Sequence, residues 1–323
     1  MVAKHVNLSV TTVIQIFDEH VQMNRNRLST AICIDEFYFS KKATHKYALL
    51  IVNFKNGLVL DVLPSREKRK LSSYFRSIDF TERAIVQYIT IDMNCNYRDI
   101  CYLYFPNAII CIDSFHVMKL INNALDSIRK RVLRKYEKDK KSDEYYLLKH
   151  KSHLLYVDID YQQYESIKHN HHFKYRISSK RQLELMLSYD SELILGWQLK
   201  ERYHIFNKKS ISVNFAKQQL NLSLDTLIQD FFNSNIEDFI TVAYTLSEWK
   251  VEISNSFLLF DDRRLSNGPI EGRNKYVKII LRLVNGYSNF DRFRNRALFT
   301  LNKHSSYCDS KLPNDIPSHI KRG

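Results

Sequence analysis

The chain has little of what marks repetitive, secreted or membrane-spanning proteins. Only six glycines and five prolines occur in 323 residues, which argues against a repetitive or linker-rich architecture. No run of about eighteen apolar residues occurs, so we expect no membrane span, and residues 1–7 lack the apolar core of a signal peptide. The five cysteines form no C-x-x-C pair, which argues against the common zinc and thioredoxin-like motifs. We therefore expect reduced thiols and a cytoplasmic location.

Positive charge is what the chain has in excess. It carries 49 Lys and Arg against 35 Asp and Glu, a formal charge of +14. Such an excess usually indicates a polyanionic partner, most simply nucleic acid, because neutralising phosphates releases bound counterions. A generally basic protein without such a partner is the alternative that charge alone leaves open. A hydrophobic content of 44% and an aromatic content of 13% indicate a globular chain.

The first 23 residues predict two short helices that are broken near Asn7. Ser9 is a plausible N-cap for the second helix, whose apolar residues follow at helical spacing. The pattern is similar to the later part of a helix-turn-helix module. Its exposed face would offer three candidate DNA-binding side chains, Thr11, Thr12 and Gln15. An ordinary helical hairpin is an equally good interpretation.

From residue 30 the apolar pattern changes from helical to extended. Predicted strands cover residues 30–39, 47–54 and 58–63, and Asn56-Gly57 is a strong hairpin signal between the last two. Alternating helices and strands follow, at 71–78, 86–91, 97–104 and 108–112. The order β-β-β-α-β-α-β predicts an α/β fold with a ribonuclease-H-like core, which is a mixed five-stranded sheet with flanking helices.

A change in composition divides the chain further. Helical spacing and dense charge dominate after the fifth predicted strand, so we predict a mainly helical insertion over residues 118–261. The catalytic core would then consist of residues 30–117 and 262–302. Residues 303–323 are polar and are predicted to form a loose tail.

Two acids stand at the ends of predicted strands that should be neighbours. Asp35 ends the first apolar run and Asp92 ends the fourth. Taken singly, Asp35 could be a turn former and Asp92 a helix N-cap. At the tips of adjacent buried strands they are together candidate ligands for divalent cations, which suit phosphoryl-transfer chemistry.

Asp113 and His116 follow the fifth predicted strand and form an accessory pair. Asp113 would lie near the same edge of the sheet and is the main rival of Asp92 for a metal. His116 could orient a carboxylate or contact a phosphate. A capped helix start with a satisfied histidine is an equally good interpretation.

Glu271 opens a long amphipathic stretch and is the third acid of interest. A polar stripe shares its helical spacing and offers three candidate DNA-binding residues, Lys275, Lys278 and Arg282. The stripe could equally be a solvated face with a Glu–Lys pair worth a few tenths of a kcal/mol. Gly268 and Gly272 flank the acid and favour the functional interpretation, because they would let a backbone or ligand approach closely.

These residues stand in a series of short ordered motifs. The motifs are Asp35-Glu36, Asp92-Met93 with Tyr97, residues 105–108 and 113–116, and Ser266-Asn267 with Glu271-Gly272 and Asn274. Together they resemble transposases of the ISL-three (ISL3) family of insertion sequences, over roughly residues 30–300. In that resemblance, Asp113 and His116 match a D-x-x-H element.

The resemblance implies a DDE transposase that cleaves DNA strands hydrolytically and transfers the 3′-hydroxyl into target DNA. Asp35, Asp92 and Glu271 would be the metal-binding triad for two Mg²⁺ ions, with Mn²⁺ as a substitute. The implied partners are the element ends and target DNA, bound by a homo-oligomer. A nucleoid-associated location follows from the same resemblance.

The amino terminus departs from the family pattern. Members normally begin with a Cys-rich, zinc-finger-like segment, whereas this chain has no such cysteines and starts inside the helix-turn-helix. We therefore expect an N-terminal truncation that weakens recognition of the element ends. Two alternative functions stay open: a structure-selective nuclease of the same fold, and an inactive DNA-binding remnant or repressor.

Overall fold

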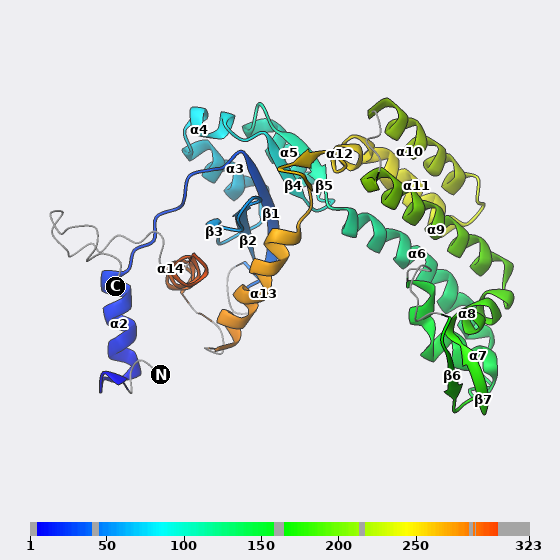
Figure 1. Ribbon diagram of the computed structural model, residues 1–323. Coiled ribbons are helices and arrows are strands. Elements are labelled where there is room, and N and C mark those ends of the chain that lie inside the picture. Colours follow the sequence, from blue (N-terminus) through cyan, green and yellow to red (C-terminus); the bar gives the residue numbers. More distant parts are fainter. Residues whose placement is uncertain are drawn as a thin grey trace. The chain divides into compact units, whose positions relative to one another are not determined.

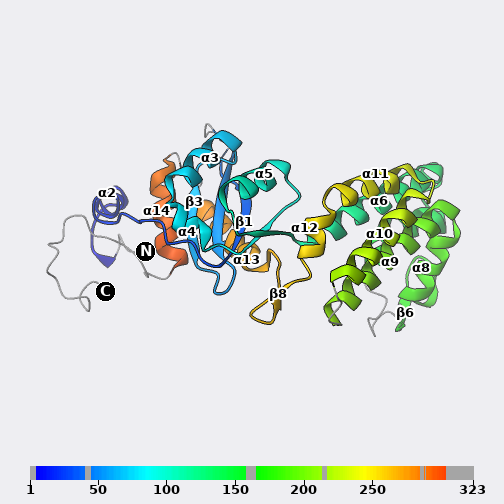
Figure 2. The same ribbon diagram turned by 90° about the horizontal axis from the view of Figure 1, so that it is seen from above.

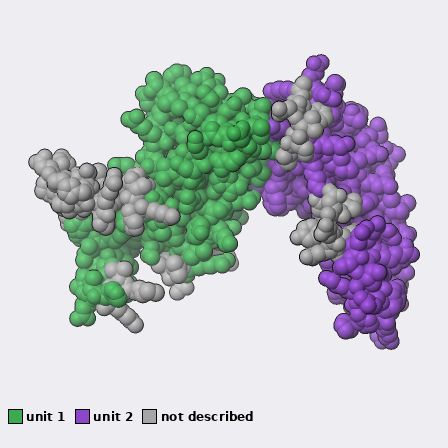
Figure 3. Space-filling model, in the orientation of Figure 1, with its two compact units in different colours: residues 1–113, 258–323 green, residues 114–257 purple. Residues whose placement is uncertain are grey.

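The chain divides into two compact units in the computed structural model. Residues 1–113 and 258–323 form the first unit, and residues 114–257 form the second (Figure 3). The structure describes residues 5–40, 45–157, 165–212, 217–283, 287 and 289–302. Within these residues no helix combines the length and apolar character needed to cross a membrane.

The first unit is built on a mixed five-stranded sheet with the order β3-β2-β1-β4-β5 (Figure 1). Its strands are β1 (Ala31–Tyr38), β2 (Tyr47–Asn53), β3 (Val59–Leu63), β4 (Tyr88–Ile91) and β5 (Ile109–Ile112). The first three strands form an antiparallel meander, and β4 and β5 run parallel to β1. Gly57 adopts a φ of 71° in the β2–β3 turn. The predicted mixed sheet and its hairpin are therefore confirmed.

Helices flank both faces of this sheet (Figures 1 and 2). They are α3 (Lys68–Ser77), α4 (Phe80–Ala84), α5 (Cys95–Tyr104), α13 (Gly268–Leu283) and α14 (Phe290–Leu301). Side chains alternate between the two faces along a strand. Cys33 and Phe37 of β1 share a buried core with Ile270 of α13 and Phe293 of α14. Glu36 points to the opposite face, where α5 supplies its partner Tyr97.

The amino-terminal segment contains α2 (Val10–His20), which belongs to the first unit. The hydroxyl of Ser9 accepts a hydrogen bond from Thr12 N at 3.0 Å, and Asn7 has a φ of 56°. The predicted N-cap and the predicted break near Asn7 are thus confirmed. Asp18 of α2 forms an ion pair with Arg292 of α14. The first helix of the expected pair and the expected tail fall mainly on residues 1–4 and 303–323, which lie outside the described residues.

Helices dominate the second unit. They are α6 (Ser114–Lys135), α7 (Asp143–His150), α8 (Ser179–Ser188), α9 (Ser191–Ser212), α10 (Lys217–Phe232), α11 (Glu237–Glu248) and α12 (Lys250–Asn255). A short hairpin of β6 (Ile167–Asn170) and β7 (Tyr175–Ser178) lies beside α7 and α8 (Figure 1). Gly196 allows α9 to approach its neighbours closely, since a Cβ there would lie 2.7 Å from Cδ1 of Ile128.

Candidate active site

Asp35 and Asp92 lie on the same face of the sheet. The sequence predicted both at strand ends, and Asp92 does follow the end of β4, but Asp35 lies within β1. Strand β1 continues to Tyr38 because β2 pairs with it beyond the point where β4 stops. Cys33 of β1 is in parallel register with Thr90 of β4, and each aspartate follows two residues later on its own chain segment. Because side chains alternate along strands, both aspartates share the face of Cys33, which is the face that α13 covers. The register therefore brings these two acids to neighbouring positions.

Asp113 occupies the equivalent position one strand further away. Thr90 of β4 also pairs with Cys111 of β5, which places Asp113 at the same edge, next to Asp92. The Asp113 side chain is buried, with the residue only 4% exposed. His116 lies in the first turn of α6, in the second unit, where its ring contacts the Phe115 ring edge-on at 5.7 Å.

Two asparagines connect α13 with the two aspartates. Asn267 Nδ2 donates to Asp92 Oδ1 at 2.9 Å, and Asn274 Nδ2 donates to Asp35 Oδ2 at 2.5 Å. The other oxygen of Asp35 accepts from Glu36 N at 2.7 Å. Both asparagines are buried. The helix is therefore attached to β1 and to the end of β4 by side chains that are directed at the candidate acids.

Glu271 lies on the same side of α13 as these asparagines. Asn267, Glu271 and Asn274 are spaced i, i+4 and i+7, so they follow one side of the helix. Glu271 is exposed, and its backbone N–H donates to Asn267 O at 2.9 Å, which places the acid in the first helical turn. Among the residues described, no three His, Cys, Asp or Glu side chains are grouped to hold a metal. Convergence of the three carboxylates on shared ions therefore stays a prediction.

The chemistry of this edge nevertheless fits a hard divalent cation. Carboxylate and amide oxygens are the donors that Mg²⁺ prefers. The Oδ1 atoms of Asn267 and Asn274 are buried and have no hydrogen-bond partner within the described parts of the chain. Buried polar atoms almost always have a partner, which can be an ordered water or an ion. Asp35, Asp92 and Glu271 are the residues that could hold the metal here.

Two carboxylates act on the buried thiol of Cys33. Burial raises the pKa of the Cys33 thiol to about 12, and the nearby charges of Asp113 and Asp35 add to the increase. The neighbouring Thr90 hydroxyl and the charge of Arg263 oppose the shift. Cys33 is therefore a neutral thiol at physiological pH. The two nearby carboxylates favour a cation beside them.

Glu36, although adjacent to Asp35 in sequence, is bound on the opposite face. Tyr97 Oη donates to Glu36 Oε2 at 2.6 Å, and Arg66 Nη1 donates to Glu36 Oε1 at 2.6 Å. Burial raises the Tyr97 pKa, and the bond to Glu36 raises it further, so the hydroxyl stays protonated. Both Glu36 oxygens are thus used in a structural network, away from the α13 face.

The candidate DNA-binding residues lie on two helices of the first unit. Lys275, Lys278 and Arg282 are exposed on α13, beyond Glu271. On α2, Thr11 and Gln15 are exposed, whereas the Thr12 hydroxyl lies 2.8 Å from that of Ser9. Thr12 is therefore engaged in capping the helix.

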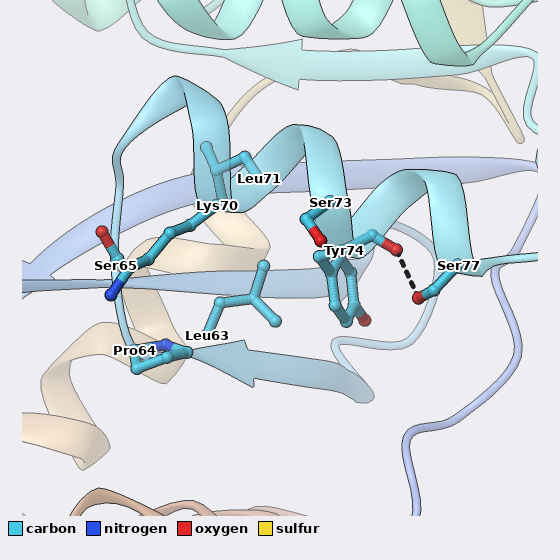
Figure 4. A pocket seen from close by; sticks show the side chains of 8 residues that line it. All are labelled: Leu63, Pro64, Ser65, Lys70, Leu71, Ser73, Tyr74 and Ser77. Atoms are coloured by element: carbon cyan, nitrogen blue, oxygen red, sulfur yellow. Dashed lines mark hydrogen bonds between the residues drawn. The ribbon is translucent and has the colours of Figure 1, made fainter.

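A pocket of about 350 Å³ lies between the end of β3 and α3 (Figure 4). Leu63, Lys70 and Tyr74 are among the residues that line it. The Tyr74 hydroxyl donates to Asp61 Oδ2 at 2.8 Å, so its polar end is already satisfied. None of the candidate acids lines this pocket, which is therefore distinct from the site that contains Asp35 and Asp92.

The sequence matches a family model whose description is transposase, over residues 32–297. That span contains Asp35, Asp92 and Glu271. The chain belongs to the ISL3 family of DDE transposases.

Curated relatives are the transposases for insertion sequence element IS1557 of two Mycobacterium tuberculosis strains, CDC 1551 / Oshkosh and ATCC 25618 / H37Rv. Each is 23% identical over 282 residues, covering 84% of this chain and 60% of the relative. The chain thus spans about 60% of the length of these relatives. No solved structure matches it.

Proposed function

We propose that the chain catalyses DNA transposition, by hydrolytic strand cleavage at the end of an insertion sequence and transfer of the freed 3′-hydroxyl to target DNA. One observation carries the proposal most directly. The hydrogen bonds of Asn267 and Asn274 attach the Glu271-bearing helix to Asp92, which follows β4, and to Asp35, which lies within β1. Family membership supports transposition as the reaction and DNA as the substrate.

We propose a ribonuclease-H-like arrangement for the catalytic core. The mixed sheet places β1, which contains Asp35, beside and parallel to β4, which Asp92 follows. The second unit interrupts this core between β5 and α13. This order of elements supports the proposal, because it brings Asp35, Asp92 and Glu271 from distant parts of the chain into the same unit.

Each side chain has a defined role in the proposed reaction. Asp35, Asp92 and Glu271 would hold two Mg²⁺ ions, for which Mn²⁺ could substitute. The bound ions would supply stabilisation of charge on the attacking and leaving oxygens and lower the pKa of bound water. Exposed cations on α13 contact DNA phosphates and fix the position of the strand without reading its sequence.

A cleavage assay tests the proposal. Purified protein is incubated with labelled terminal DNA of the element and with Mg²⁺ or Mn²⁺, and nicks that leave a 3′-hydroxyl are expected. A second assay supplies pre-cut ends and target DNA, and joined products are expected from a transposase but not from a nuclease. The double variant Asp35→Asn/Asp92→Asn serves as the control. Binding without any nicking would instead support the inactive remnant.

We also propose that the active species on DNA is a homo-oligomer in the bacterial cytoplasm. Family membership supports this assembly, because transposition has to bring DNA ends and target together. Light scattering of the complex with terminal DNA would give its mass. A complex with one protein chain per DNA end and no association between ends would contradict the proposal.

A further inference from the structure

The side chain of Asn267 does not cap its own helix, although the residue stands at the N-cap position. Its backbone carbonyl accepts from Glu271 N, so it stands at the N-cap of α13. An N-cap asparagine normally uses its side-chain oxygen to accept from the first-turn N–H groups. Here Oδ1 has no partner among the described residues, and Nδ2 instead donates to Asp92, 175 residues away in sequence. The side chain is therefore directed at the aspartate and not at its own helix.

Asn274 stands where packing alone would favour an apolar residue. It lies between Ile270 and Val277 on the buried side of α13, and both of these neighbours are fully buried. Burying an amide costs stability unless its polar atoms are paired. Only Nδ2 is paired, with Asp35, while Oδ1 has no partner in the described parts of the structure. Packing therefore does not account for an asparagine here.

We propose that Asn267 and Asn274 are positioning residues for the divalent-cation site. Each Nδ2 holds the carboxylate of one aspartate, and each Oδ1 accepts a hydrogen bond from water carried by the bound cation. Mg²⁺ keeps several of its waters when bound to proteins, which gives the two oxygens a partner. This inference rests on the proposed function, because it takes Asp35 and Asp92 as cation ligands.

An amide suits this role better than a charged donor. A lysine or arginine could also orient a carboxylate, but its positive charge would repel the cation. The two bonds also set the rotation of α13, since a turn of one residue, about 100°, would break both of them. Asn267 and Asn274 thereby determine which side of the helix faces Asp35 and Asp92.

Leucine substitutions separate positioning from stability. Asn267→Leu and Asn274→Leu keep two atoms on Cγ, as in asparagine, but replace the amide donor and the unpaired oxygen by larger methyl groups. Binding of Mn²⁺ to the DNA-free protein is measured by electron paramagnetic resonance, and melting is measured by circular dichroism. Mn²⁺ affinity is expected to fall about 10–100-fold, as for other outer-shell partners of metal ligands. The melting temperature is expected to stay the same or rise. Asn→Ala versions replace any leucine variant that does not fold.

Asn302 provides the matched control. It is 6% exposed, as Asn274 is, and lies in the same unit. Its amide is fully paired, since Oδ1 accepts from Val59 N and Nδ2 donates to Val59 O, both at 2.9 Å. Asn302→Leu is expected to lower the melting temperature and leave Mn²⁺ affinity unchanged, the reverse of the pattern for Asn274→Leu.

A dependence of cleavage on Mn²⁺ concentration gives a second readout. High Mn²⁺ should restore cleavage to the Asn274 variant but not to Asp35→Asn, because only the latter loses a ligand. Mn²⁺ affinity within twofold of the parent in both asparagine variants would overturn the inference while leaving the proposed function intact. A parent that binds Mn²⁺ no better than Asp35→Asn/Asp92→Asn would instead overturn both.

Discussion

Asp35, Asp92 and Asp113 lie at equivalent positions on neighbouring strands or directly after them. The order of these strands predicts different roles for Asp92 and Asp113. We predict that Asp35→Asn, Asp92→Asn or Glu271→Gln reduces single-turnover DNA cleavage by about a thousandfold or more, because each removes a ligand that acts with the others as a unit. Asp113 lies one strand further from Asp35 and is buried. Asp113→Asn should therefore cost only about 10–100-fold, as for an outer-shell partner.

The same cleavage measurements can contradict the assignment of Asp92 as the second metal ligand. If Asp113→Asn were as severe as Asp35→Asn while Asp92→Asn remained active, Asp113 would be the second metal ligand. DNA binding without metal serves as the control, and it should change little in all four variants, because conservative amide substitutions keep the shape of each side chain.

Sequence reasoning reached the acids but not the residues that hold them. Asp35 and Asp92 each end an apolar run. For Asp92 this local pattern marks the end of β4, whereas β1 continues past Asp35 to Tyr38, because β2 pairs with it there. Asn267 and Asn274 are part of a sequence motif, but their hydrogen bonds to Asp92 and Asp35 could not be predicted. These bonds join residues that are 175 and 239 positions apart. The available clue was an asparagine on the apolar side of a helix, where burial of an amide requires a reason.

At the level of elements, two helical glycines should respond in opposite ways to the same added methyl group. A Cβ at position 196 would lie 2.7 Å from Ile128 and 3.1 Å from Phe239, so Gly196→Ala is expected to destabilise the second unit by about 1–3 kcal/mol. A Cβ at position 272 would meet nothing within 4 Å. Gly272→Ala should therefore stabilise the chain by about 0.5–1 kcal/mol, because glycine is unfavourable within a helix.

Gly272 also tests whether DNA approaches α13 beside Glu271. If the open space there is used by bound DNA, Gly272→Ala lowers DNA affinity and cleavage although it raises the melting temperature. Titrations with labelled duplex and thermal unfolding of the same sample measure the two effects. Unchanged affinity and cleavage would show that the glycine has no part in DNA contact.

Asp126 of α6 accepts a hydrogen bond from Tyr156, in the segment that follows α7. Its ionisation should make the stability of the second unit depend on pH. Burial opposes its charge, but hydrogen bonds from Arg129, Lys130 and Tyr156 outweigh burial and lower its pKa from 3.8 to about 2. Arg129 Nη1 also donates to Leu148 O at 2.7 Å. Because the folded pKa is depressed, this stabilisation is present above about pH 4 and is lost as the pH falls towards 2.

We predict that Asp126→Asn removes about 1 kcal/mol of stability at neutral pH, a value reduced by solvent screening of a partly exposed group. The variant should also lose less stability than the parent between about pH 4 and 2. Urea unfolding can be followed by tryptophan fluorescence, because both tryptophans, Trp197 and Trp249, lie in the second unit. Parallel pH profiles for parent and variant would contradict this assignment.

Predictability also differed between elements. The long alternating and apolar strands of the sheet were predicted closely, since burial of both faces imposes a continuous apolar run. Helix α4 and the β6–β7 hairpin were not predicted. Phe80–Ala84 is only one turn and a half, and the strands Ile167–Asn170 and Tyr175–Ser178 are largely exposed and polar. Such elements are held by their neighbours, so their own sequences carry little periodicity.

For the whole molecule, the charge of +14 predicts DNA binding that weakens steeply with salt. Each phosphate neutralised contributes about −0.9 to the slope of log K against log salt on B-DNA. Lys275, Lys278 and Arg282 are exposed along α13, and a triple alanine variant should reduce the slope by about 2.7 if all three contact phosphates. Fluorescence anisotropy of labelled random duplex at increasing KCl measures both slopes.

Local contact and net charge can be separated by a second variant with the same loss of charge. Lys138, Lys140 and Lys141 are exposed in the second unit, and replacing all three by alanine also removes three positive charges. If α13 lies against the DNA backbone, the slope of the α13 variant falls by most of the predicted reduction, whereas the slope of the control variant changes little. The reason is that charges farther from the DNA than a Debye length of about 10 Å are screened. Equal losses in the two variants would mean that only net charge matters. A parent slope near zero would contradict DNA as the partner of this chain.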